Sequence, residues 1–358
     1  MANRILILRL DAIGDFVLFS GALPHLRKMF PQDEITLALH SAVAPIAEQC
    51  PYVDNILPID RARFRSDIEY THNLTASVRG KFDVAINTMY TRTEVSDNII
   101  ARTHAPQKIG FECTDKDGAE GRRLQDQIVY TDLIRSSAEW IYEIERYAQL
   151  LGQLGIVVSA DKVRPELWIQ KTERERAEAL LKREALQEKK FMIVCPGAGF
   201  ATKLWSSESF ARTADAIAER HGMKVVFIGS TDDRDLVDSI RSQMTHPAIT
   251  LAGQLGLREF AALTSYAGLY VGLDTAGFHL AWTSGIPTVG IFGGGHFGRF
   301  IPSMPNVRIA HVLMDCYHCY WHCIYDEVKC MTSITPEIVL KEVDEVLHAR
   351  VVVKAEHL

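Results

Sequence analysis

Short apolar runs recur along nearly the whole chain and alternate with longer segments in which apolar and charged residues mix. The runs are rich in Val, Ile and Leu and do not alternate with polar residues, which is typical of strands buried on both faces. The longer segments have the composition of amphipathic helices. This alternation predicts an α/β fold in which parallel sheets are covered by helices.

The pattern predicts strands in both halves of the chain, with a charged helical stretch around residues 170–190 between the halves. The predicted strands are residues 4–10, 34–39, 55–59, 82–87 and 107–111, and then 191–195, 224–229, 248–251, 269–273 and 287–292. A long helix is predicted near 138–155, and the polar, aperiodic residues 112–127 predict a mobile surface loop. We expect two Rossmann-like, doubly wound domains that face each other across a cleft, residues 1–170 and 171–358, with a last helix that can pack back on the first domain.

The stretch LRLDAIGDFVLF, residues 8–19, places two carboxylates where the first strand ends. Asp11 and Asp15 flank Gly14 between two apolar runs. A turn needs only the glycine, so the acids indicate helix capping, chemistry or both. A helix follows, and Pro24 is expected to kink or restart it.

A glycine-rich loop in the second half, CPGAGFATKLWSSESF, connects a strand to a helix. Gly197 and Gly199 allow a tight turn with exposed N–H groups, and Lys203 adds a positive charge, so the loop suits a phosphate. Ser206 is the expected N-cap of the helix. An ordinary strand-to-helix loop with a solvated lysine is an equally good interpretation of this stretch alone.

A second loop, GLDTAGFHLAW, strengthens the phosphate interpretation. Asp274 follows a strand, Thr275, Ala276 and Gly277 begin a helix whose free N–H groups suit an anion, and His279 lies one turn inside it. Singly, Asp274 is explained as an N-cap and His279 as a buried histidine. Together with the lysine loop and a flexible glycine run that follows the next strand, they suit a nucleotide diphosphate leaving group without Mg²⁺.

Asp232 and Asp233 end a further strand, where an acid can accept hydrogen bonds from ribose hydroxyls. A first-turn role in a helix explains one of these acids equally well. No G-x-G-x-x-G follows the first strand, which argues against a dinucleotide dehydrogenase, and Leu204 after Lys203 excludes a Walker A loop.

Composition narrows the class of protein. The chain has 358 residues, 47% of them hydrophobic, and a formal net charge of −6, which is typical of a soluble globular protein and argues against a general nucleic-acid binder. The N-terminal MANRILILRLD carries charges and lacks the apolar core of a signal peptide, and no run approaches the ~18 apolar residues of a membrane span. We expect a cytoplasmic protein, with peripheral contact at the inner membrane left open.

Four of the seven cysteines crowd into CYHCYWHCIYDEVKC, namely Cys316, Cys319, Cys323 and Cys330. In a cytosolic chain such a cluster indicates a metal site or reduced thiols rather than disulfides. The C-x₂-C-x₃-C-x₆-C spacing could close a tetrahedral structural site for zinc or iron, with His318 or His322 as spare ligands. The spacing is tighter than in paired C-x₂-C zinc motifs, so reduced packing thiols are the alternative.

Four stretches, in order along nearly the whole chain, resemble motifs of the ADP-heptose:lipopolysaccharide heptosyltransferase family, glycosyltransferase family nine. They are ILRLDAIGDFVLFSGALPHLRKMFP, PGAGFATKLWSSESFART, GSTDDRD and GLDTAGFHLAWTSGIPTVGIFG. The resemblance implies the GT-B fold and transfer of a sugar, mostly from ADP-L-glycero-D-manno-heptose, with inversion and without a catalytic metal. The expected acceptor is a lipopolysaccharide core or another cell-surface glycan or glycolipid, and no nucleic acid is expected as a partner.

The resemblance also implies roles for single residues. Asp15 matches the acid of the family's Gly-Asp pair, taken as the catalytic base, which makes Asp11 a polar turn residue or a competing base. Lys203 matches the lysine that contacts the donor phosphate. Asp274 and His279 match the family's D-[ST]-x-x-x-H donor motif.

Departures from the family pattern gather near the expected donor site. Asp233 stands where the family usually has a glutamate beside the nucleoside, Ala276 where many members have glycine, and Gly277 at a frequent proline position. FGGGHFGRF also differs from the common F-G-P-T. The sugar and the base of the donor therefore stay open.

Two other functions stay open from the sequence. One is a GT-B epimerase or hydrolase of nucleotide sugars, which needs no glycan acceptor. The other is a catalytically silent protein that binds a nucleotide sugar. Nucleotide release measured with and without an acceptor separates these functions from glycosyl transfer.

Overall fold

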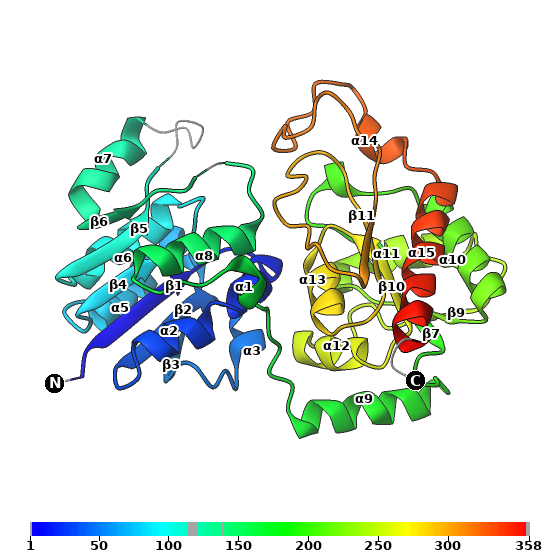
Figure 1. Ribbon diagram of the computed structural model, residues 1–358, viewed down its shortest axis with the longest axis horizontal. Coiled ribbons are helices and arrows are strands. Elements are labelled where there is room, and N and C mark those ends of the chain that lie inside the picture. Colours follow the sequence, from blue (N-terminus) through cyan, green and yellow to red (C-terminus); the bar gives the residue numbers. More distant parts are fainter. Residues whose placement is uncertain (1, 114–119, 138, 356–358) are drawn as a thin grey trace. The chain divides into compact units, whose positions relative to one another are not determined.

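The computed structural model describes residues 2–113, 120–137 and 139–355. The chain divides into two compact units, Met1–Trp168 and Ile169–Leu358, each of which contains a six-stranded sheet (Figure 1). All strand pairs among the described residues are parallel. The predicted α/β class with two parallel sheets is confirmed.

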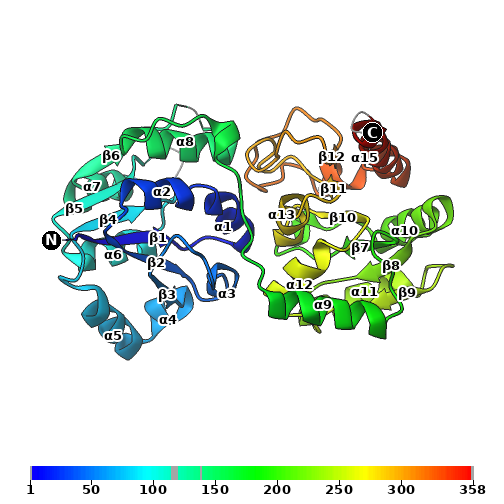
Figure 2. The same ribbon diagram turned by 60° about the horizontal axis from the view of Figure 1, so that its bottom comes forward.

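The sheet of the first unit has the order β3-β2-β1-β4-β5-β6. Its strands are β1 (Arg4–Arg9), β2 (Glu34–His40), β3 (Asn55–Ile59), β4 (Val84–Asn87), β5 (Gln107–Phe111) and β6 (Asp132–Ile134). Its helices are α1 (Ile13–Ser20), α2 (Leu23–Met29), α3 (Ala44–Ala47), α4 (Arg61–Ser66), α5 (Ile68–Val78), α6 (Glu94–Thr103), α7 (Glu120–Val129) and α8 (Glu143–Gln153). Helices α1, α2 and α8 lie on one face of the sheet, and α4, α5 and α6 cover the other (Figure 2).

The sheet of the second unit has the order β12-β11-β10-β7-β8-β9. Its strands are β7 (Phe191–Cys195), β8 (Lys224–Phe227), β9 (Ala248–Thr250), β10 (Leu269–Leu273), β11 (Thr288–Ile291) and β12 (Val307–Ala310). Its helices are α9 (Lys171–Arg183), α10 (Ser207–His221), α11 (Arg234–Arg241), α12 (Leu257–Thr264), α13 (Ala276–Thr283), α14 (Lys329–Thr332) and α15 (Pro336–Ala355). Helix α15 packs on α10 and on strands β11 and β12 of its own unit.

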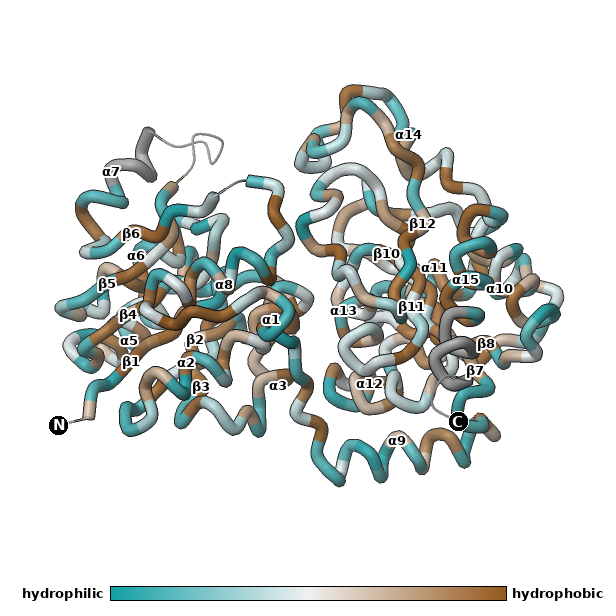
Figure 3. The backbone as a smooth tube through the Cα atoms, in the orientation of Figure 1, coloured by the Kyte–Doolittle hydropathy of each residue, from teal (hydrophilic) through white to brown (hydrophobic). Residues whose placement is uncertain are grey.

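The hydrophobic core of each unit lies between its sheet and the covering helices, and Figure 3 shows the apolar residues gathered along the strands. In β1 the four residues from Ile5 to Leu8 are each 0% exposed. A central strand covered on both faces has no solvent side, so its sequence is a continuous apolar run rather than an alternating one. This is why the inner strands were predictable. None of the described helices combines the length and apolarity needed to span a bilayer.

Several sequence expectations need correction. Strands β6 and β12 were not predicted, because both are short edge strands without a continuous apolar run. Residues 120–127 belong to helix α7 rather than to the predicted loop, and residues 114–119 of that loop lie outside the described residues. The helix predicted from residue 138 begins at Glu143. The expected restart at Pro24 is confirmed, because α1 ends at Ser20 and Pro24 lies in the first turn of α2.

Candidate functional site

The two acids of the opening motif, Asp11 and Asp15, follow the carboxyl end of β1. Helix α1 begins directly after it, with Ala12 at the N-cap position, so Asp15 is the third helical residue rather than the N-cap. The Asp15 Oδ2 accepts a hydrogen bond from the Ala12 backbone N–H at 3.2 Å. A carboxylate in this first turn also faces the positive end of the helix dipole. Capping therefore accounts for part of the reason why an acid stands at position 15.

Asp11 makes a two-point ion pair with Arg9, the last residue of β1. The Arg9 Nε lies 2.9 Å from Oδ1 and Nη2 lies 2.6 Å from Oδ2 of Asp11. The Arg9 side chain is 1% exposed, donates to the Thr88 carbonyl at 2.8 Å, and packs with its guanidinium carbon 5.3 Å from the Phe19 ring and 5.0 Å from the Tyr147 ring. Asp11 thus neutralises a buried cation, which is a structural role.

Burial and the charged groups around Asp11 change the pKa of this carboxyl group. Burial raises the pKa of Asp11, Arg9 opposes this effect, and repulsion by Asp15 and Glu143 adds to the rise. A raised pKa suits a general base, so the chemistry alone keeps Asp11 as a competitor of Asp15. The pairing of both Asp11 oxygens with Arg9 argues for the structural role instead.

In the second unit, the two loops singled out by the sequence meet at the carboxyl ends of adjacent strands β7 and β10. The Lys203 Nζ donates to the Asp274 Oδ2 at 2.7 Å and to the Asp274 backbone carbonyl at 3.2 Å. The two side chains are 15% and 12% exposed, so this pair is only slightly hydrated. Lys203 is therefore held at the loop that begins α13.

Helix α13 begins with Thr275 at its N-cap position and Ala276 as its first residue. The first N–H groups of a helix have no partner within the helix, so they can bind an anion. A side chain at Gly277 would lie 2.7 Å from the Tyr270 hydroxyl oxygen and 3.3 Å from the Cys195 sulfur. Close packing at Gly277 therefore leaves no room for a side chain unless the Tyr270 hydroxyl shifts.

His279 lies inside α13 and is 4% exposed. Burial lowers the pKa of His279 to about 4, Asp274 opposes this effect and Lys203 adds to it, so the ring is neutral near pH 7. Its Nδ1 lies 3.3 Å from the Nε1 of Trp282, which donates to it. The environment is that of a buried histidine with a hydrogen-bond partner.

Asp233, after β8, packs against the glycine-rich loop after β7. Its Oδ2 accepts hydrogen bonds from the Ser230 backbone N–H at 2.6 Å and from the Ser230 hydroxyl at 2.8 Å. A Cβ at Gly197 would overlap the Asp233 carboxylate, so glycine at position 197 permits this close approach. A Cβ at Gly199 would meet no atom within 4 Å. Ser206 caps α10 as predicted, accepting from the Ser209 N–H at 3.1 Å.

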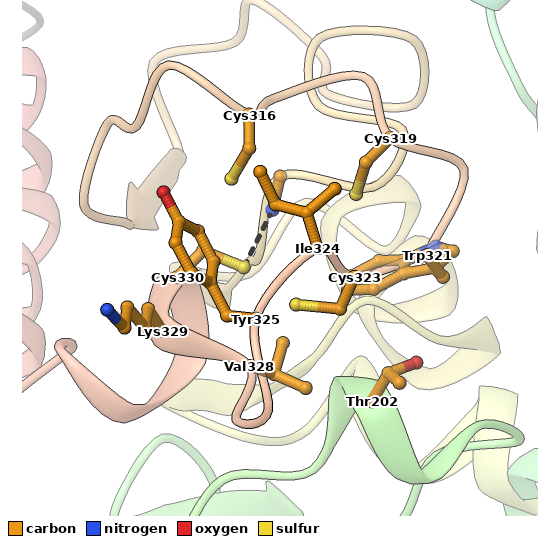
Figure 4. A pocket seen from close by; sticks show the side chains of 11 residues that line it. Thr202, Cys316, Cys319, Trp321, Cys323, Ile324, Tyr325, Val328, Lys329 and Cys330 are labelled. Carbon is orange, nitrogen blue, oxygen red and sulfur yellow. Dashed lines mark hydrogen bonds between the residues drawn. The ribbon is translucent and has the colours of Figure 1, made fainter.

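The four clustered cysteines line one pocket beside this loop, and their sulfur atoms point into it (Figure 4). All four are free thiols. Burial raises the pKa of Cys330, and the Gly294 N–H, which donates to its sulfur at 3.4 Å, opposes that effect. Within the described part of the chain, however, no group of three or more His, Cys, Asp or Glu side chains could hold a metal ion. The thiols share a pocket, but their present arrangement is not a metal site.

Sequence reasoning missed two side chains that the fold brings to these sites. One is Arg9, a charge inside an apolar strand, and that position was itself a signal of a buried ion pair. The other is Trp321, whose ring centre lies 5.0 Å from the Lys203 Nζ. Nothing in the local sequence of Trp321 indicates a contact with a lysine so far away along the chain.

Comparison with known proteins agrees with this architecture. The crystal structure of a family 9 glycosyl transferase from Veillonella parvula superposes with a TM-score of 0.80 at 22% identity, covering 97% of both chains. The ADP-heptose LPS heptosyltransferase II of Escherichia coli gives a TM-score of 0.69 at 20% identity, covering 97% of this chain and 99% of that chain. These likenesses establish the GT-B fold.

Sequence comparison extends the likeness. The lipopolysaccharide core heptosyltransferase OpsX of Haemophilus influenzae is 25% identical over 297 residues, which cover 80% of this chain and 78% of OpsX. Residues 71–329, well over half of the chain, match the model of glycosyltransferase family 9 (heptosyltransferase). The chain therefore belongs to glycosyltransferase family 9, and it is a glycosyltransferase.

Proposed function

We propose that this chain transfers a heptose from ADP-heptose to a lipopolysaccharide core or another cell-surface glycan or glycolipid. The observation that carries the proposal is the Lys203–Asp274 pair beside the first turn of α13, where a diphosphate would meet a cation and free backbone N–H groups. The names of the relatives supply the sugar and the acceptor, since OpsX is a lipopolysaccharide core heptosyltransferase and the E. coli neighbour an ADP-heptose LPS heptosyltransferase.

Residues 171–358 are the donor domain in this proposal. Negative charge grows on the diphosphate as the bond to the sugar breaks, and Lys203 with the start of α13 would offset that charge. These groups supply the positive charge that a divalent cation supplies in other transferases, so the proposed reaction needs no catalytic metal. Asp233 would accept hydrogen bonds from the ribose, and the remaining donor contacts would come from Gly197, Gly199, Thr275, Ala276, Gly277 and His279.

Residues 1–170 are the acceptor domain in this proposal, with Asp15 as the general base. The acceptor hydroxyl attacks the anomeric carbon from the face opposite the diphosphate, its proton passes to Asp15, and ADP leaves with the bonding electrons. A single displacement of this kind inverts the anomeric configuration. Because a lipopolysaccharide precursor is lipid-linked, the enzyme would work in the cytoplasm at the surface of the inner membrane.

The cysteine pocket does not enter this reaction. Four thiolates are the ligand type that zinc and iron take in structural sites, but the described residues are not arranged to hold an ion. Metal binding by these thiols is a separate prediction about the stability of this part of the second unit. No step of the proposed transfer is routed through a metal.

The test is ADP release from ADP-heptose, measured with and without a heptose-deficient lipopolysaccharide, with UDP- and GDP-sugars as alternative donors. Release that depends on the acceptor supports the transfer. Turnover without acceptor would instead support the epimerase or hydrolase, and binding of ADP without turnover would support the silent protein. Preference for a UDP- or GDP-sugar would replace ADP-heptose as the donor.

A further inference from the structure

Trp321 is a second partner of the lysine in the proposed donor site. The Lys203 Nζ lies 5.0 Å from the centre of the Trp321 ring, within the range of a cation–π contact. The indole Nε1 lies 3.3 Å from the His296 Nδ1, to which it donates, so both the plane and the edge of the ring are engaged. The ammonium group is therefore held between the Asp274 carboxylate and an aromatic face.

A run of three glycines after β11, Gly293 to Gly295, fixes the place of this ring. A Cβ at Gly295 would overlap the Trp321 ring, and a Cβ at Gly293 would lie 3.1 Å from it. Backbone hydrogen bonds join the same run to the cysteine-rich segment, from the His318 N–H to the Gly294 carbonyl at 2.8 Å and from the Tyr320 N–H to the Gly295 carbonyl at 3.1 Å. The glycines are thus a surface on which the ring packs rather than an open flexible loop.

The backbone that carries the ring adopts an uncommon conformation. His318, Tyr320 and Trp321 have φ values of +68°, +52° and +63°, in the left-handed region that bulky residues rarely adopt. Such a conformation costs free energy and persists only where surrounding contacts hold it, and residues of this kind cluster at functional sites. Here the contacts with the glycine run hold it, and the result is a ring presented to Lys203.

We propose that Trp321 is a positioning residue for glycosyl transfer, which holds the Lys203 ammonium group in place for the donor diphosphate. This proposal rests on the proposed donor role of Lys203. A lysine side chain has four rotatable carbon–carbon bonds, and Asp274 alone would fix it with a negative charge that repels the diphosphate. A ring face attracts the ammonium without adding a full negative charge, so the lysine stays ordered and available to phosphate.

The experiment is a double-mutant cycle on kcat/KM for ADP-heptose, with variants Trp321→Leu, Lys203→Ala and their combination. We expect Trp321→Leu to lower kcat/KM by roughly three- to thirtyfold, the range of partly desolvated cation–π contacts. In the Lys203→Ala background the same change should alter kcat/KM by less than about twofold, because the ring then has no ammonium to hold. Trp321→Phe keeps a weaker aromatic face, so its loss of kcat/KM should be smaller than that of Trp321→Leu.

Tyr317→Leu is the matched control, because the Tyr317 ring packs on Gly294 of the same run but faces Phe297, 5.0 Å away between ring centres. It should stay within about twofold of the wild type. If Trp321→Leu does not fold, the cycle is run with Trp321→Phe, with an expected two- to fivefold loss. If Trp321→Leu lowers kcat/KM equally in the wild-type and Lys203→Ala backgrounds, and Lys203→Ala is itself impaired, the proposed role of Trp321 is wrong and the donor role of Lys203 stands. Wild-type turnover of Lys203→Ala overturns the donor role of Lys203 and the present proposal with it.

Discussion

Replacing each acid of the opening motif by its amide separates the catalytic role from the structural one. Asp15→Asn removes the proposed base but keeps a side-chain oxygen that can accept from the Ala12 N–H, now 3.2 Å away. Asp11→Asn removes the negative charge that pairs with Arg9, whose side chain is 1% exposed. The two changes are chemically identical, so their different surroundings decide the outcome.

We expect opposite results for the two variants: Asp15→Asn should mainly lower turnover, and Asp11→Asn should mainly lower stability. An amide loses the favourable interaction with the positive helix end, so Asp15→Asn should lower the free energy of unfolding by less than about 1 kcal/mol. It cannot take a proton, so turnover should fall by roughly 10²-fold or more, with normal ADP affinity. Removing one partner of a buried ion pair costs about 3–5 kcal/mol, but Asp11 is 23% exposed and Arg9 keeps Glu143 as a second partner at 3.8 Å, so we expect about 2 kcal/mol. Folded Asp11→Asn should keep turnover within about tenfold of the wild type.

Two measurements on each variant check this reasoning. Urea unfolding of the intact chain gives the change in stability, and ADP release from ADP-heptose below the unfolding midpoint gives turnover. The wild type at the same urea concentrations is the control for general loss of structure. A stable but inactive Asp11→Asn, together with an active Asp15→Asn, would show that Asp11 is the base and that the wrong carboxylate was assigned.

Three further predictions concern the second unit. Lys203→Ala should lower turnover by about 10²-fold, because a charge that stabilises the leaving diphosphate is lost, and ADP-release kinetics on folded protein check it. His279 should make the chain less stable in acid: its pKa is about 4 when folded and near 6.5 when unfolded, so the unfolded state binds the proton first and stability falls as pH drops from 6.5 to 4. Relative to His279→Gln, the wild type should lose ~3 kcal/mol of its free energy of unfolding by pH 4, as measured by urea unfolding. Stability profiles that run parallel with pH in the two proteins would contradict this prediction. Elemental analysis of protein purified without added metal should show about one zinc or iron ion per chain if the clustered thiols bind one, and a stoichiometry near zero would end that idea for Cys316, Cys319, Cys323 and Cys330.

The inner strands of both sheets followed from the sequence, because a central parallel strand is buried on both faces and its residues form a continuous apolar run. The same local rule failed for two edge strands, β6 and β12, although it found the edge strands β3 and β9. In β6, with the sequence DLI, only Ile134 is buried, so its residues do not differ from those of a loop. Helix α7 was missed because only Leu124, Ile128 and Val129 of its residues are apolar, which are too few for their helical spacing to be recognised within a polar stretch.

For the candidate site, too, the sequence predicted some features and missed others. The sequence by itself determined that Asp15, Lys203 and Asp274 follow strands, since the order of apolar runs and turns is a local property, and parallel strands bring their carboxyl ends to one edge of a sheet. Only the tertiary structure decided which of these groups pair: that Arg9 occupies both oxygens of Asp11, and that Trp321 lies against Lys203. Such contacts join residues far apart in the chain, and their energies depend on burial and distance, which no local pattern of residues encodes.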